Sequence, residues 1–138
     1  MPCPYFEPQA VAAAPQHASA RLPLLDEYDG VCRAHPEPIP APAERRFRCC
    51  NHGYSYNLCD LFPAASSQSC FRYTVLRESS DGLDILCVEE RNYAPVRWHP
   101  AHYRFESAAL EPELADACMR AQALAFCRSY LQRFRPAS

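Results

Sequence analysis

The sequence contains no lysine, because all 14 of its basic residues are arginine. This excludes Schiff-base chemistry on a lysine and the lysine of a P-loop. Glycine is also scarce: Gly30, Gly53 and Gly82 are the only three, so there is no glycine-rich loop to hold a phosphate. Acidic residues number 16 and the net charge is -2, which leaves no basic surface for nucleic acid. We therefore expect no nucleic-acid partner.

Long hydrophobic runs are absent as well. The chain opens Met1-Pro2-Cys3-Pro4, and the apolar run from Val11 to Ala14 is too short for the core of a signal peptide. No stretch approaches the roughly 20 apolar residues of a membrane-spanning helix. The sequence predicts a cytoplasmic protein without a membrane partner. In that reducing compartment cysteines are more often metal ligands or catalytic groups than disulfides.

Proline and cysteine are the residues in excess, with 14 prolines and nine cysteines. Most prolines precede residue 64, and because proline fixes φ and lacks an N–H donor, we expect no long regular elements there. One short helix is predicted from Pro42 to Cys50, ended by Gly53. Aromatic and leucine side chains in the same region require burial, so a metal–thiolate site is expected to supply the missing order.

Residues 70–138 have a more conventional pattern. Two strands, from Cys70 to Glu78 and from Leu83 to Arg91, flank a turn at residues 79–82. Charge pairing favours a register with Arg77 opposite Asp84. That register gives one apolar face, formed by Phe71, Tyr73, Val75, Leu86 and Val88.

A helix is predicted from about Pro112 to Phe134, because apolar residues recur there at helical spacing. Its apolar stripe consists of Leu114, Ala117, Ala121, Leu124, Cys127, Leu131 and Phe134. The fold class is therefore α+β. A hairpin-based antiparallel sheet is packed by a long C-terminal helix, next to a Pro/Cys-rich, loop-dominated N-terminal lobe. We expect a single domain over residues 1–138, with the lobe in 1–69 and the hairpin and helix in 70–138.

The nine cysteines fall into two groups. Four alternate with apolar neighbours in predicted strands and helix and should be buried core thiols, namely Cys70, Cys87, Cys118 and Cys127. The other five lie in loops or at the ends of elements, where thiolates can converge. These five are the predicted metal ligands, and four of them would complete a site: Cys3, Cys32, Cys49, Cys50 and Cys59.

Neighbouring Cys49 and Cys50 would point about 100° apart on a helix, so one should bind metal while the other packs in the core. Cys50 is favoured as the ligand because it follows Phe47 by three residues, but the choice between Cys49 and Cys50 stays open. Paired C-x2-4-C knuckles are absent, and scattered cysteines among aromatic residues favour a [4Fe–4S] cluster over Zn. His35 and His52 keep zinc open as an alternative.

The Met1-Pro2-Cys3-Pro4 start and the segment from Cys49 to Tyr54 carry a resemblance. They resemble a family of small, uncharacterised, cysteine-rich bacterial proteins with an M-x-C-P start and a CCN-x-GY segment. The resemblance implies no activity, but it supports treating the five N-terminal cysteines as one set. The cysteine doublet is also similar to zinc- or iron-chelating domains, whose C-x2-C spacing is missing here.

Three functions remain open. The leading one is an iron–sulfur or metal-binding accessory or redox protein. The second is a metal-free protein-interaction module with buried cysteines, so a protein partner is left open. The third is a thiol-dependent enzyme, which is disfavoured because no nucleophile signature surrounds any cysteine. His99 and His102 are expected in an exposed loop, and Trp98 is expected to be a packed aromatic residue.

Overall fold

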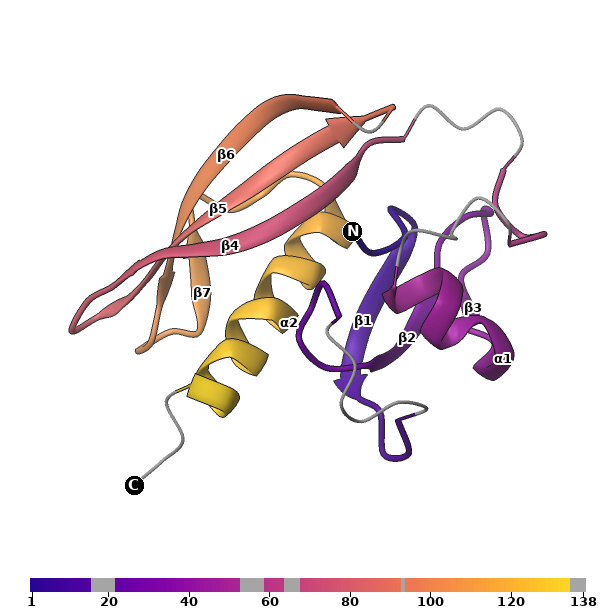
Figure 1. The fold of residues 1–138 in the computed structure, drawn as a ribbon, viewed down its shortest axis with the longest axis horizontal. Coiled ribbons are helices and arrows are strands. Elements are labelled where there is room, and N and C mark those ends of the chain that lie inside the picture. The colour runs from indigo at the N-terminus through magenta and orange to yellow at the C-terminus, as the bar shows by residue number, and fades with distance from the viewer. Residues whose placement is uncertain (16–21, 53–58, 64–67, 93, 135–138) are drawn as a thin grey trace.

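The computed structural model describes residues 1–15, 22–52, 59–63, 68–92 and 94–134. Within them lie two antiparallel sheets and a C-terminal helix that packs on the larger sheet, which confirms the α+β class (Figure 1). One cluster of buried apolar side chains includes Phe6 and Leu24 from the N-terminal half and Ile85 and Phe126 from the C-terminal half. Gly53, the expected helix end, lies outside the described residues. No helix among those described is long and apolar enough to cross a membrane.

The N-terminal half contains a three-stranded sheet, although its proline content predicted no long regular elements there. Its strands are β1 (Phe6–Val11), β2 (Tyr28–Cys32) and β3 (Ile39–Pro40), in the order β1-β2-β3. The prolines of these strands lie in the two edge strands, and the β1 register shifts between Pro8 and Ala10. Edge strands and bulges are where a sheet tolerates proline, so proline density is a poor guide to the absence of strands.

Gly30 lies inside β2. Its partner across the sheet is Pro8, and the two backbones approach closely. A Cβ atom at Gly30 would stand 2.1 Å from the carbonyl oxygen of Glu7. Only glycine fits there, and this close approach keeps Cys32, at the end of β2, beside the N-terminal segment.

A short α1 (Ala43–Arg45) continues directly into the π-helix η1 (Arg46–Asn51), where a single short helix was predicted. The larger sheet follows, with strand order β4-β5-β6-β7. Its strands are β4 (Cys70–Glu78), β5 (Gly82–Arg91), β6 (Ala94–Arg104) and β7 (Ala109–Glu111). His99 and His102 lie within β6, so their expected position in an exposed loop is wrong.

The β4–β5 hairpin has the predicted register only next to its turn. Arg77 lies opposite Asp84 as expected, but the register shifts between Val75 and Arg77. Beyond this irregularity Tyr73 pairs with Cys87 instead of Val88, so the predicted apolar face is wrong for the second strand. A shift of one residue moves every following side chain to the opposite face. Ile85 and Cys87 therefore join Tyr73 in the core cluster, whereas Leu86 and Val88 lie on the opposite face of the strand, where Val88 is still buried.

Helix α2 (Ala117–Phe134) begins five residues later than predicted. The Asp116 carboxylate accepts a hydrogen bond from the backbone N–H of Met119 at 2.8 Å, which is the geometry of an N-cap. The helix lies between the two sheets and contacts β1 and β4 (Figure 1). It is therefore buried on more than one side, and the single predicted stripe is wrong in part: Gln122 and Ser129 are buried, whereas Phe134 is exposed.

The side chain of Gln122 joins the helix to both sheets. Its Nε2 donates to the carbonyl oxygens of Cys3 at 2.9 Å and Phe6 at 2.8 Å. Its Oε1 accepts a hydrogen bond from the Tyr73 hydroxyl at 2.9 Å. The side chain is 1% exposed, so these bonds are shielded from water. A buried amide that is fully bonded fixes the relative position of the elements that it joins.

We expect Gln122→Leu to lower the free energy of unfolding by about 2 kcal/mol or more, because buried polar groups on three segments lose a partner. Gln132→Leu is the matched control on the same helix: Gln132 is exposed, and the change should stay within about 0.5 kcal/mol. Urea denaturation followed by circular dichroism measures both. Equal effects of the two substitutions would contradict the role of Gln122.

Candidate metal centre

The five predicted ligand cysteines line one small, apolar cavity of about 20 Å³. They come from separate segments of the chain. Cys3 precedes β1, Cys32 ends β2, Cys49 and Cys50 belong to η1, and Cys59 follows the helix. Space for one water molecule requires roughly 10–15 Å³ by the same measure, so the cavity has the size of a single small ion.

The π-helical geometry of η1 positions two of these cysteines. The N–H of His52 donates to the carbonyl oxygen of Phe47 at 2.9 Å, a bond that spans five residues instead of four. Both Cys49 and Cys50 line the cavity, although an α-helix was expected to turn one of them toward the core. Single π-turns are rare and occur frequently at functional sites.

Asn51 attaches this helix to β2. Its Oδ1 accepts from the Tyr28 N–H at 2.8 Å, and its Nδ2 donates to the carbonyl oxygens of Tyr28 at 3.0 Å and Arg46 at 2.8 Å. The side chain is fully buried. Cys50 and Cys32 are therefore held on two elements that a buried amide locks together.

Backbone bonds fix the N-terminal segment in the same place. The N–H of Cys3 donates to the carbonyl oxygen of Cys50 at 3.0 Å, and the N–H of Arg33 donates to that of Tyr5 at 2.8 Å. The rings of Tyr5 and Phe62 meet edge to face with centroids 5.5 Å apart, and both line the cavity. Aromatic side chains thus cover the thiols from the side of the Cys59 segment.

Arg45 is a lining residue that the sequence analysis did not identify. Its guanidinium forms an ion pair with Asp60 at 2.7 Å, which links α1 to the residue after Cys59. A sequence signal was present, because Arg45 precedes Cys49 by four residues and so shares its helix face. A thiolate-ligated centre carries net negative charge, which a neighbouring guanidinium offsets.

Burial favours the protonated form of three of the cavity thiols, Cys3, Cys49 and Cys50. Burial raises the pKa of Cys50 to about 12, and it also raises the pKa of Cys3 well above the ordinary thiol value. Burial raises the pKa of Cys49, and so does neighbouring Cys59, whose side chain is hydrogen-bonded to it. None of the nine cysteines forms a disulfide. A metal at this place would therefore have to displace protons as it binds.

The thiols share a cavity without forming a finished coordination sphere. Within the described ranges, no three His, Cys, Asp or Glu side chains are arranged so that they could hold a metal ion as they stand. His35 bonds the carbonyl oxygen of Leu61 at 3.0 Å, and the ring of His52 packs on Phe47. Neither histidine is among the described residues that line the cavity. Ligation would require the sulfur atoms to move closer together.

The remaining cysteines lie in the core, as predicted. Cys70, Cys87, Cys118 and Cys127 are all buried, and burial raises the pKa of the last three to about 12. A catalytic thiol needs the opposite shift, toward the thiolate. None of the six cysteines with a shifted pKa therefore has the environment of an activated nucleophile.

Two histidines of β6 contact carboxylates, and the tryptophan of the same strand is exposed. His99 contacts the carboxylate of Glu89 at 3.0 Å, and His102 contacts that of Asp84 at 2.7 Å. Trp98 is 59% exposed, so its interpretation as a packed aromatic residue is wrong. No family model, no curated protein and no solved structure matches this chain.

We expect the alkylation rate of Cys50 in the metal-free protein to rise with pH up to at least pH 9.5 without reaching a plateau. Only the thiolate reacts, and its fraction keeps increasing below a pKa of about 12. Iodoacetamide labelling with peptide mapping measures the rate, and free glutathione is the reference thiol. A plateau below pH 8 at Cys50 would instead indicate an activated nucleophile.

Proposed function

We propose that this protein binds a metal centre through cysteine thiolates of the small cavity and works as an accessory or redox protein. The observation that carries the proposal is the convergence of Cys3, Cys32, Cys49, Cys50 and Cys59 from separate segments. The other four cysteines do not line this cavity. Five sulfur atoms exceed the four that a zinc ion or an iron–sulfur cluster uses.

A [4Fe–4S] cluster is the centre that the surroundings favour. The cavity wall includes Tyr5, Leu61 and Phe62, and an apolar enclosure limits access of water to a cluster. Arg45 supplies a positive charge beside the sulfur atoms. The absence of paired knuckles in the sequence points the same way. The cavity would have to widen around the cluster.

A single zinc ion is the second candidate, and the volume of the cavity favours it. About 20 Å³ accommodates one small ion without displacing the lining residues far. Among the five thiols, Cys50 is buried and the other four are partly exposed, and Cys49 and Cys59 contact each other. We infer that Cys3, Cys32 and Cys50 are ligands of either centre and that Cys49 and Cys59 compete for the fourth position.

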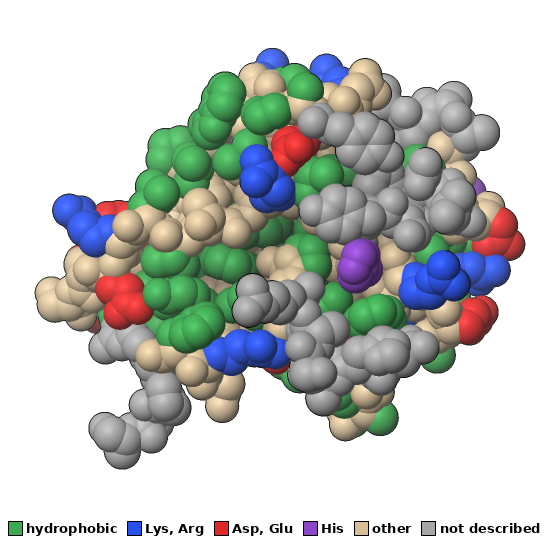
Figure 2. Space-filling view, viewed as in Figure 1, with side chains coloured by type: hydrophobic (Ala, Val, Ile, Leu, Met, Phe, Trp, Pro, Cys, Tyr) green, Lys and Arg blue, Asp and Glu red, His purple; other side chains and the backbone are tan. Residues whose placement is uncertain are grey.

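A protein-interaction surface is a separate candidate function. Hydrophobic side chains gather over β4 to β6 on the face shown in Figure 2. Leu76, Val96 and Trp98 are large apolar residues of these strands that remain exposed. A fully folded protein without any metal would favour this alternative over the metal centre.

Purification without oxygen is expected to give a brown protein with broad absorption near roughly 400 nm and about four iron and four sulfide per chain. A colourless protein with one zinc would replace the cluster by the second candidate. A folded protein with neither iron nor zinc, and no uptake of either after reconstitution, would refute the metal centre. Iron, sulfide and zinc assays on one preparation distinguish these outcomes.

We expect Cys59→Ser to lose most of the bound metal if Cys59 is the fourth ligand, while Cys127→Ser keeps it. Cys127 is fully buried in the core and does not line the cavity, so its replacement tests general destabilisation alone. Bound metal also stabilises the folded state, so removing it with a chelator should lower the Tm of the wild-type chain and of Cys127→Ser. If Cys49 is the fourth ligand instead, Cys49→Ser should lose the metal and Cys59→Ser should keep it. Loss of metal in Cys127→Ser alone would contradict the ligand set.

A further inference from the structure

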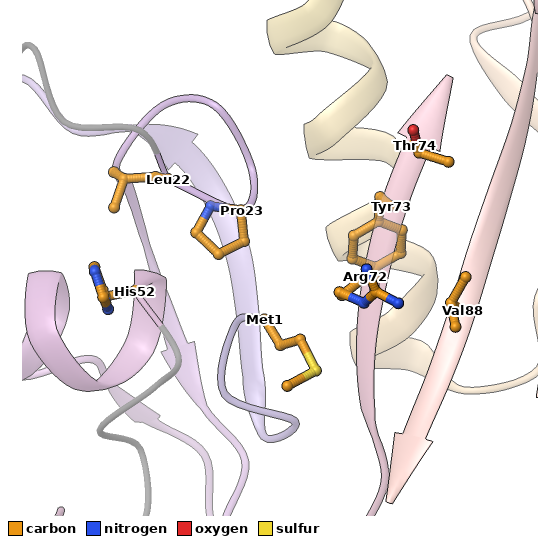
Figure 3. A pocket seen from close by; sticks show the side chains of 8 residues that line it. All are labelled: Met1, Leu22, Pro23, His52, Arg72, Tyr73, Thr74 and Val88. Carbon is orange, nitrogen blue, oxygen red and sulfur yellow. The ribbon is translucent and has the colours of Figure 1, made fainter. Parts of the chain in front are cut away.

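A second cavity, of about 390 Å³, lies between the N-terminal lobe and β4 of the larger sheet (Figure 3). Its volume falls in the range of roughly 300–1,000 Å³ that is typical of small-molecule sites. The lobe contributes Leu22, Pro23 and His52, and the sheet contributes Arg72, Thr74 and Val88. It is distinct from the cavity of the five cysteines, because none of these residues lines both.

Most of its wall is apolar. Leu22 and Val88 are buried side chains on opposite sides, and Met1 extends between them in Figure 3. Such walls favour the apolar body of a ligand, because burying its surface is worth about 25 cal/mol per Å². A fully polar ligand such as inorganic phosphate would lose water without gaining partners on these walls.

Two basic side chains line the cavity. Arg72 stands on β4 and His52 follows η1 on the opposite side (Figure 3). No Asp or Glu is among the described residues that line the cavity. Arg72 therefore offers a partner for one anionic group of a ligand, in addition to its ion pair with Glu90.

Glu90 prepares Arg72 for such a group. The Nε of Arg72 donates to the carboxylate of Glu90, which is itself buried. A guanidinium has five N–H donors, so bonding through Nε leaves the terminal groups available in a fixed orientation. The terminal N–H groups of a guanidinium match the two oxygens of a carboxylate.

We propose that this cavity binds a small carboxylic acid with an apolar body. The carboxylate contacts the terminal N–H groups of Arg72, and the apolar body packs against Leu22 and Val88. Thr74, two residues along the same strand, offers a hydroxyl beside Arg72. The site does not require the metal centre, although His52 follows Cys50 by two residues and places the two cavities next to each other along the chain.

Isothermal titration of the full chain with 3-phenylpropanoate tests the proposal, with 3-phenylpropan-1-ol as the uncharged analogue. We expect the carboxylate to bind at least about tenfold more tightly than the alcohol, since a charge-assisted hydrogen bond contributes this much. Arg72→Gln should abolish that preference. Arg77→Gln is the matched control, because Arg77 also lies on β4 and pairs with a β5 carboxylate, Asp84, at 2.8 Å.

A second variant tests the walls of the cavity instead of the charge of Arg72. Thr74→Trp adds a bulky ring at an exposed strand position, where aromatic residues are tolerated, and should block binding while keeping Arg72. Circular dichroism verifies that each variant is folded. No binding up to millimolar concentration, equal affinity for the alcohol, or equal loss in Arg72→Gln and Arg77→Gln would each overturn the proposal. Titrating the metal-loaded and metal-free chains separates this result from the fate of the metal centre.

Discussion

The hydrogen bonds of the Gln122 amide are the constraint on which the arrangement of this protein depends. They connect α2 to the carbonyl oxygens of Cys3 and Phe6 on one side and to the hydroxyl of Tyr73 on the other. The helix is thereby fixed between a small sheet and a large one. Tyr28 adds a second link between β2 and α2, because its hydroxyl donates to the carbonyl oxygen of Ala125 at 2.8 Å. The N-terminal lobe is thus ordered by polar bonds to the rest of the chain.

These hydrogen bonds bear on why the lobe would carry a metal site. The sequence suggested that sulfur ligation must order a lobe without regular structure. The lobe instead has its own sheet, a π-helix held by Asn51 and a share of the common core. The lobe therefore has backbone pairing, side-chain hydrogen bonds and core contacts beside any contribution from sulfur ligation. A metal that binds thiols of this lobe would displace their protons and draw the sulfur atoms together.

The two cavities arise at different places in the packing of the N-terminal lobe. Where η1, β2 and the N-terminal segment meet, aromatic rings and backbone bonds leave a small apolar space with sulfur atoms on its wall. Where the lobe meets β4, the contact is less complete and a larger space remains, with Arg72 and His52 on opposite sides. Packing within the lobe therefore determines the cysteine cavity, whereas the docking of the lobe against the larger sheet determines the second one.

The sequence by itself predicted what depends on local composition. It separated the five cysteines of loops and element ends from the four of the core, and it predicted the α+β class from the hairpin and the final helix. It could not predict the register irregularity before Arg77, which turned Leu86 and Val88 away from the core. It also could not predict that β1 and β3 tolerate proline as edge strands, or that η1 adopts a π-helix.

Those features depend on partners distant in the sequence. Gly30 lies in a strand because the backbone of Glu7 approaches it, and Cys49 and Cys50 line the same cavity because the helix that carries them widens. Local propensity contains no information on such contacts. Residue types and their spacing were therefore enough to pick out the cysteines that line one cavity, whereas only the tertiary structure decided where their sulfur atoms lie.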